Sequence, residues 1–255
     1  MTLSRFYCPI EITTGQIIEL PANVAHHAAR VLRLEQGDEI TLFNGNGGEF
    51  SAIIARISKS GTMVEVAEQF DIERESPLNI TLVQAVCASE KMDWIMQKGV
   101  ELGVSRIQPI VTKRSMVKLA GERADKRVRH WQQIVISACE QCGRNHVPQV
   151  LPLLSLPDWL DGQMIEWRNL CHGTPHNLCF MLSPTAEKSL CDFPKVTQVA
   201  ALTLLVGPEG GFAPEEEAAA LVIGFVPLRL GERILRTETA ALAAVAAMQA
   251  LWGDY

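Results

Sequence analysis

The stretch LTLLVGPEGGFAPEEEAAALVIGFVPLRLGERILRTET, residues 202–239, indicates the fold of the C-terminal part of the chain. It opens with a short continuous apolar run, as expected of a strand that is covered on both faces. Pro214 then precedes three glutamates, which is typical of a helix start, because proline has no amide to leave unpaired there and acids suit the helix dipole. A second apolar run, residues 225–228, and a polar loop follow. The stretch therefore predicts strand, glycine loop, helix, strand, loop and helix.

The glycine loop is a candidate ligand site. Glycine occupies three of the five positions 207–211, so the backbone there can approach a ligand closely or adopt positive φ. Ligands of open α/β sheets bind at the carboxyl ends of strands, where both loops of this stretch fall. The loop matches neither GxxxxGK[ST] nor GxGxxG, and Glu209 with the following acids would repel a phosphate. A neutral or cationic small molecule is favoured; the alternative is a tight structural turn before a solvated helix start.

Length and charge limit the number of domains and the kinds of binding partner that the chain can have. A chain of 255 residues can form one large or two modest domains. The net charge of -6 does not indicate nucleic-acid binding, but residues 106–129 carry eight bases against two acids, whereas residues 151–255 carry six bases against twelve acids. This asymmetry predicts one basic face on an acidic molecule; a solvated helix face is the alternative.

The seven cysteines show no disulfide-like spacing, and neither a signal-peptide core nor a membrane-spanning run is present, so a reducing cytoplasm is expected. Cys139 and Cys142 have a CxxC spacing with His146 nearby. Since no second CxxC follows, we expect reduced helix cysteines and no metal site.

Residues 1–72 are predicted to form a small β-barrel, with strands at 16–20, 39–43, 49–57 and 63–69 and a glycine-rich hairpin turn at 44–48. One helix, residues 22–34, carries His27, Arg30 and Arg33 at three-residue spacing, which suggests an RNA contact or a basic solvated face. A polar linker at 71–77 separates a second domain, residues 73–255.

The second domain alternates strands and helices, which predicts an α/β fold with a mainly parallel sheet. Strands are expected at 80–86, 107–111, 178–182, 202–206 and 225–228, and helices at 90–102, 123–142 and 238–252, whereas residues 148–170 show no regular pattern. Thr237 is expected to cap the last helix. The alanines of that helix permit close packing, within the domain or across a dimer.

LVGPEGGF and LGERILRTETA closely resemble the cofactor-binding loops of the SPOUT methyltransferases, and within them the RsmE family, the 16S ribosomal RNA uridine-N3 methyltransferases. Three further segments carry the resemblance: HAARVLR at 27–33, QKGVELG at 97–103 and ACEQCGR at 138–144. The resemblance implies a PUA-like β-barrel that helps to bind RNA, a SPOUT domain with a C-terminal trefoil knot, and a homodimer that acts on 16S rRNA in the small ribosomal subunit.

The resemblance also implies the cofactor S-adenosylmethionine, whose cationic sulfonium agrees with an acidic loop. Three loops would hold it, with the adenine against the last. The cofactor-binding residues implied are Met181, Leu182, Ser183, Gly207, Pro208, Glu209, Gly210, Gly211, Leu230, Gly231, Ile234 and Leu235.

Methylation of uridine N3 requires loss of the N3 proton, stabilisation of charge on the uracil oxygens and an unpaired base. Arg236 is the candidate that contacts the uracil, unless it pairs with Glu232 or Glu238, and Glu209 is a candidate base or sulfonium partner. Two other functions stay open: a non-catalytic RNA-binding or ribosome-assembly protein, and a SPOUT enzyme for another RNA. The candidate RNA-binding residues are Arg5, His27, Arg30, Arg33, Lys113, Arg114 and Arg144.

Overall fold

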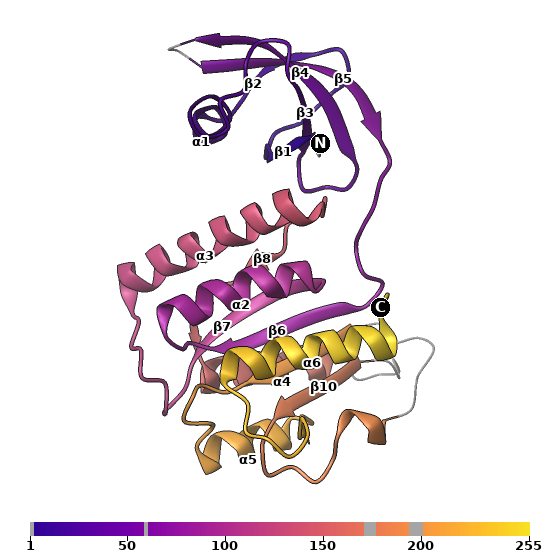
Figure 1. Ribbon diagram of the computed structural model, residues 1–255. Helices are drawn as coiled ribbons and strands as arrows, with labels where there is room; N and C mark the ends of the chain where they lie inside the picture. The colour runs from indigo at the N-terminus through magenta and orange to yellow at the C-terminus, as the bar shows by residue number, and fades with distance from the viewer. Residues whose placement is uncertain (1–2, 59–60, 171–176, 194–200) are drawn as a thin grey trace. The chain divides into compact units, whose positions relative to one another are not determined.

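The computed structural model describes residues 3–58, 61–170, 177–193 and 201–255. The chain divides into two compact units, of which the first contains Met1–Glu75 and Ile136–Val147 and the second contains Ser76–Val135 and Pro148–Tyr255. Helix α3 (Gly121–Cys142) therefore begins in the second unit and ends in the first (Figure 1). The return of residues 136–147 to the first unit was not predicted from the sequence, and the functional boundary expected at 72/73 stays a prediction.

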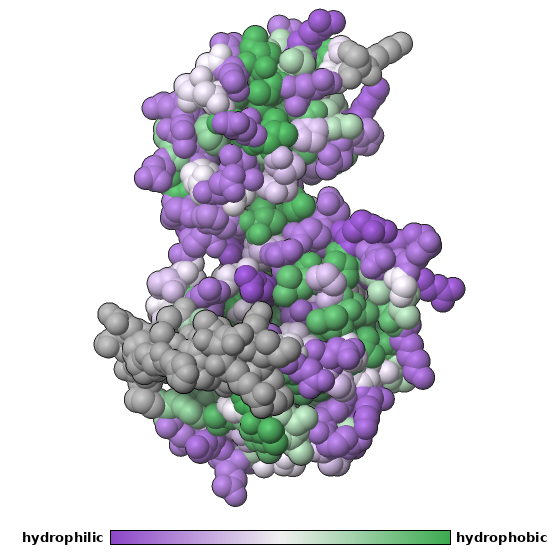
Figure 2. Space-filling model, turned by 180° about the vertical axis from the view of Figure 1, so that it is seen from behind, coloured by the Kyte–Doolittle hydropathy of each residue, from purple (hydrophilic) through white to green (hydrophobic). Residues whose placement is uncertain are grey.

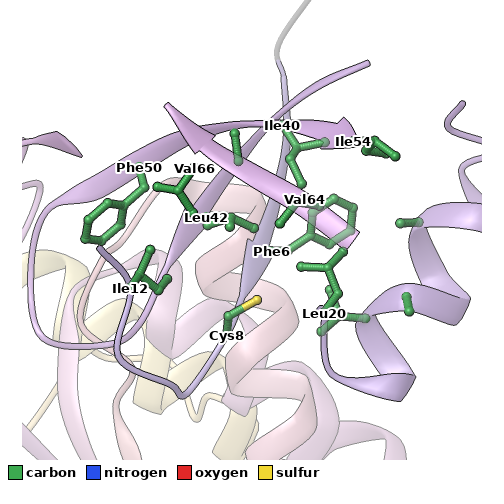
Figure 3. Close-up of a cluster of buried hydrophobic side chains, with 14 residues drawn as sticks. Phe6, Cys8, Ile12, Leu20, Ile40, Leu42, Phe50, Ile54, Val64 and Val66 are labelled. Carbon is green, nitrogen blue, oxygen red and sulfur yellow. The ribbon is translucent and has the colours of Figure 1, made fainter. Parts of the chain in front are cut away.

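The first unit is a five-stranded sheet over one apolar core. Its strand order is β1-β3-β4-β5-β2, with β1 parallel to β3 and the other neighbours antiparallel. Apolar side chains of these strands, Phe6, Leu42 and Val64 among them, gather on one side of the sheet (Figure 3). The strands span β1 (Ser4–Tyr7), β2 (Ile17–Glu19), β3 (Glu39–Phe43), β4 (Glu49–Ser58) and β5 (Gly61–Phe70).

The expected hairpin joins β3 to β4, where Gly45, Gly47 and Gly48 adopt the positive φ that a glycine-rich turn permits. Strand β1 was not predicted, because a four-residue strand with one fully buried side chain leaves little pattern in the sequence.

The helix predicted over residues 22–34 is shorter and changes type. An α-helix, α1 (Ala22–His26), continues as a π-helix, η1 (His27–Val31), in which the Leu32 N–H donates to the His27 carbonyl five residues back, at 3.0 Å. Arg33 then ends the segment with φ +56°. His27, Arg30 and Arg33 are all exposed, but the wider helix removes the single α-helical face that their spacing predicted.

The second unit confirms the predicted α/β fold. Its seven-stranded sheet has the order β12-β10-β11-β6-β7-β8, with β9 also pairing with β7, and every one of these pairs is parallel. The trefoil knot stays a prediction. The strands span β6 (Asn79–Ala85), β7 (Val104–Val111), β8 (Gln149–Val150), β9 (Leu154–Ser155), β10 (Asn177–Leu182), β11 (Ala201–Val206) and β12 (Val226–Leu228).

Successive residues of a strand point to opposite faces of the sheet, so both faces of this apolar sheet need to be covered. Helices cover each face. Val83 and Leu205 pack with Trp159 of α4 (Leu156–Leu170) and with Ala220 of α5 (Pro214–Val222). Gln84, the neighbour of Val83, hydrogen-bonds on the other face to Thr237 of α6 (Thr237–Trp252). Helix α2 (Ser89–Glu101) packs beside α6 on this face (Figure 1).

The alanine-rich face of α6 is used inside the unit. Ala241 and Ala244 are fully buried, so their small side chains allow α6 to lie close to α2 and the sheet. Gln249 ties the two helices together, because its side-chain amide donates to the Leu102 carbonyl and accepts from the Ser76 hydroxyl, each at 2.8 Å.

Helix α4 was missed in the sequence. Its start carries a signal that could have revealed it: the Ser155 hydroxyl accepts a hydrogen bond from the Asp158 N–H, as a helix cap does, and also donates to the Asp158 carboxylate.

No helix of the described ranges is long and apolar enough to cross a membrane. The visible surface of the second unit combines hydrophilic residues with smaller hydrophobic patches, an ordinary mixture for a folded domain (Figure 2).

Candidate functional site

A cavity of about 300 Å³ lies at the carboxyl ends of β10, β11 and β12. Three loops and the start of α6 form its wall: the end of β10, the glycine loop 207–212 and the loop 229–236. These are the three loops that the family resemblance implies would hold a cofactor together. The predicted residues that line the cavity are Leu182, Ser183, Gly207, Pro208, Glu209, Gly211, Leu230, Gly231, Ile234, Leu235 and Arg236.

Two predicted residues lie outside the lining. Met181 is buried and belongs to the hydrophobic core, since the alternation of the strand turns it away from the cavity. Gly210 faces Arg114, whose guanidinium donates to the Gly210 carbonyl at 3.0 Å. The sequence did not predict several other lining residues: Pro184, Val206, Phe212, Glu217, Leu228, Arg229, Arg233, Thr237 and Ala240.

The glycine loop has its shape for steric reasons. A Cβ at Gly207 would lie 3.1 Å from the Phe212 ring, which is closer than nine in ten real contacts of that atom. Gly211 adopts φ +68° and donates its N–H to the Pro208 carbonyl at 2.9 Å, which closes a tight turn. The loop thus needs glycine for close packing at one end and for a left-handed conformation at the other.

A buried hydrogen-bond chain anchors the loop. The Thr237 hydroxyl donates to the Gly207 carbonyl at 2.6 Å and accepts from the side-chain amide of Gln84 at 3.1 Å. The prediction that Thr237 caps α6 is wrong: Arg236 occupies the cap position, without a side-chain cap, and the Thr237 hydroxyl is committed to the glycine loop instead.

Glu216 fixes the other side of the loop. It is almost fully buried and accepts hydrogen bonds from the Ala213 N–H, at the start of α5, and from the Lys113 N–H, both at 2.8 Å. The Lys113 ammonium pairs with Glu215. Lys113 and Arg114, both predicted RNA contacts, therefore stand directly beside the glycine loop.

Arg236 lies exposed at the cavity wall. Glu232 pairs instead with Arg229 at 2.9 Å, and Glu238 lies 3.5 Å from Lys91. Within the described ranges no carboxylate forms an ion pair with Arg236, so its guanidinium is available to a ligand.

Glu209 is held as a carboxylate. Burial raises its pKa, but hydrogen bonds from backbone N–H groups and from Lys91, 3.0 Å away, outweigh burial, so the net pKa is below the ordinary value. An ionised carboxylate at the cavity wall attracts a cation and is a weak proton acceptor at neutral pH.

The comparisons with known proteins identify the family. Residues 74–249 match the RNA methyltransferase domain, and residues 20–61 match the RNA methyltransferase PUA domain. Over 252 residues the chain is 32% identical to the ribosomal RNA small subunit methyltransferase E of Buchnera aphidicola, covering 99% of this chain and 98% of that protein. The chain belongs to the RsmE family.

Two solved structures extend the RsmE match to the whole fold. A protein from Legionella pneumophila, solved with the bound cofactor SAM, is 40% identical with a TM-score of 0.91. A ribosomal RNA small subunit methyltransferase E from Neisseria gonorrhoeae, solved with S-adenosyl methionine, is 42% identical with a TM-score of 0.87. Both similarities cover 100% of each chain.

In this RsmE protein, two residues that were predicted to contact RNA instead form ion pairs within the first unit. Arg144 is 5% exposed and forms an ion pair with Glu75. Arg5 pairs with Glu49 and donates to the Asn145 side chain at 2.7 Å. Both guanidinium groups connect segments of the unit, so the structure argues against phosphate contacts for Arg5 and Arg144. These partners could not be predicted from the sequence, because they lie 44 to 140 residues away along the chain.

No three His, Cys, Asp or Glu side chains of the described residues come together in a group that could hold a metal ion. Cys139 is buried and its thiol donates to the His146 carbonyl at 3.7 Å, while burial raises its pKa to about 12. A thiol in that state is inert.

Proposed function

We propose that this protein is an S-adenosylmethionine-dependent methyltransferase that methylates N3 of a uridine in 16S rRNA of the small ribosomal subunit. One observation carries the proposal: three loops from separate parts of the chain meet in one cavity, whose wall holds an ionised Glu209 and an Arg236 that has no carboxylate partner among the described residues. Membership of the RsmE family and the SAM-bound relatives support the same reading.

The cavity fits the proposed cofactor chemically. Its volume of about 300 Å³ is at the lower end of ligand sites, as suits one small molecule. Leu182, Leu228 and Ile234 supply apolar surface for a nucleobase, and the loop backbone at Leu230 and Gly231 supplies polar groups. Glu209 suits a cationic ligand. When bound, S-adenosylmethionine supplies an electrophilic methyl group.

Arg236 acts on the nucleic-acid side of the reaction. Its guanidinium keeps its charge and offers several fixed donors, so it can stabilise the negative charge that spreads over the uracil oxygens as N3 loses its proton. Holding the methyl acceptor in line should supply a large part of the rate, since proximity and orientation can remove about 7–11 kcal/mol of a barrier. Glu209 contributes attraction for the cation and leaves proton removal to another group.

RNA binding is proposed for exposed basic side chains of both units. Arg30 and Arg33 present cations on the first unit beside the exposed His27, and Lys113 and Arg114 present cations beside the glycine loop. Contacts to phosphates would make affinity fall with salt. The family resemblance further supports a cytoplasmic homodimer, a trefoil knot around the cofactor site, and separate RNA-binding and catalytic domains divided at residues 72/73.

The test is methyl transfer from labelled S-adenosylmethionine to small subunits from a strain that lacks this protein, followed by reverse transcription. A methyl on N3 blocks pairing, so one new stop with stoichiometric label is expected. Arg236→Ala should abolish the label, whereas Arg106→Ala, an exposed arginine near the amino end of β7, should not. Label without the stop would indicate another atom or another RNA, and absent label with absent cofactor binding would support the non-catalytic alternative.

A further inference from the structure

Lys91 connects three elements around the candidate site. It lies in the first turn of α2, and its ammonium is 3.0 Å from the Glu209 Oε1 in the glycine loop. The same ammonium is 3.5 Å from the Glu238 Oε2 in the first turn of α6. Lys91 does not line the cavity, although Glu209 does.

The two carboxylates need this ammonium. The Glu238 side chain is only 10% exposed, and its Oε2 atom has no hydrogen-bond partner among the described residues beyond this ion pair. Two carboxylates beside one ammonium would repel each other in its absence, and the repulsion grows as the surroundings become less polar. The hydrogen bond with Glu209 also raises the pKa of Lys91, so the ammonium stays charged.

The position of Glu209 makes this ion pair important for the loop. Glu209 lies in the middle of the glycine loop, between the Thr237 anchor at Gly207 and the tight turn at Gly211. The glycines give this loop more conformational freedom than other residues would, so side-chain anchors must hold it in place. At its centre the Glu209 carboxylate is held by the Lys91 ammonium and by backbone N–H groups, that of Ala88 included.

We infer that Lys91 is a positioning residue that holds the glycine loop in its binding conformation by joining Glu209 to Glu238. The inference rests on the proposed function only in naming S-adenosylmethionine as the ligand. Two effects of removing Lys91 oppose each other: loosening of the loop weakens ligand binding, whereas removing a positive charge near the cavity strengthens the binding of a cation.

A pair of ligands separates these effects. S-adenosylmethionine carries a sulfonium, whereas S-adenosylhomocysteine is the corresponding thioether without that charge. Calorimetry should show that Lys91→Met weakens S-adenosylhomocysteine about tenfold, or about 1.4 kcal/mol, and weakens S-adenosylmethionine by a smaller factor, because the lost positive charge partly offsets the loosening of the loop for the cationic ligand. Lys91→Arg, which keeps the charge, should restore most of the affinity. Unchanged binding of both ligands, or tighter S-adenosylmethionine with unchanged S-adenosylhomocysteine, would overturn the inference.

Lys98→Met is the matched control, because Lys98 lies on the same helix and, in the part of the chain that the structure describes, forms its ion pair with Glu101 at 2.8 Å, away from the cavity. It should leave both affinities unchanged. Thermal unfolding of each variant identifies any general loss of folding, in which case Lys91→Arg serves as the milder test.

Amide hydrogen exchange tests the inference without any ligand. Residues 207–211 should exchange faster in ligand-free Lys91→Met than in the wild type, and the additional change Glu238→Gln should restore protection by removing the repulsion. Equal exchange in wild type and Lys91→Met would overturn the inference. If the wild type binds neither ligand but Lys91→Met exchanges faster, the proposed cofactor fails while the positioning role stands.

Discussion

The hydroxyl of Thr237, the first residue of α6, donates a 2.6 Å hydrogen bond to the carbonyl oxygen of Gly207, the first residue of the glycine loop. The same hydroxyl accepts from Gln84, which is fully buried in β6. A strand, a loop and a helix are thus fixed to one another at one oxygen atom. Its glycines give the loop a backbone with many accessible conformations, and hydrogen bonds to residues elsewhere in the chain restrain it.

Thr237→Val keeps the shape of the side chain and removes this oxygen. The Gly207 carbonyl and the Gln84 amide then lose a partner, and the expected cost is about 1–3 kcal/mol in the free energy of unfolding. Urea denaturation measures the cost, and calorimetry should show weaker cofactor binding. Thr237→Ser should retain both properties, and Thr239→Val, at an exposed site on the same helix, is the control. Equal stability of Thr237→Val and wild type would contradict the anchoring role.

Gly207→Ala should deform the loop, because the new methyl carbon would lie 3.1 Å from the Phe212 ring. Crowding of this kind costs about 1–3 kcal/mol, and cofactor affinity should fall with it. Gly162→Ala is the opposite case, since open space surrounds that position in α4, and the variant should gain about 0.5–1 kcal/mol. Thermal and urea unfolding of the two variants should therefore move in opposite directions; the same direction for both would contradict the steric account.

Arg144→Ala should lower the free energy of unfolding rather than remove a direct contact with RNA. The substitution leaves the largely buried Glu75 carboxylate without its ion-pair partner, at an expected cost of about 3 kcal/mol. Arg30→Ala, at an exposed position of η1, should leave the unfolding midpoint unchanged and weaken RNA binding. Denaturation and filter binding separate the two results. A stable Arg144→Ala variant with weakened RNA binding would restore Arg144 as an RNA contact.

Glu140 should give the first unit a distinct pH dependence. Burial raises the pKa of its carboxyl, and the hydrogen bond from the Tyr7 N–H at 3.0 Å only partly opposes this. The folded state therefore binds the proton more tightly than the unfolded state, so this group lowers stability as pH rises from the unfolded pKa through the folded pKa. Glu140→Gln keeps an oxygen acceptor without the charge and should be more stable than wild type at pH 7.

Urea midpoints at pH 4 and pH 7 measure this effect. The gain from Glu140→Gln should be larger at pH 7 than at pH 4, whereas Glu65→Gln, at an exposed position of β5, should show no such difference. A loss of stability in Glu140→Gln at pH 7 would show that the charged form is favoured in the folded state.

Most elements of this fold could be predicted from the sequence, because their signals are local. The strand at β3, the hairpin glycines and the Pro214 helix start follow from side-chain period, backbone freedom and the helix dipole, each within a few residues. The two C-terminal loops were also recognisable, since their motifs are continuous. Helix α4 was not predicted, although the hydrogen bond from the Asp158 N–H to the Ser155 hydroxyl at its start is local.

The partners of individual side chains were decided only by the tertiary structure. The sequence placed Thr237 at a helix start but could not show that its hydroxyl reaches Gly207, and it marked Arg144 as basic but not as buried against Glu75. It gave no sign that Lys91 joins Glu209 to Glu238. Local patterns set which elements form, whereas charge pairing and burial depend on residues that the folded chain brings together from up to 147 positions apart, a distance over which no sequence period operates.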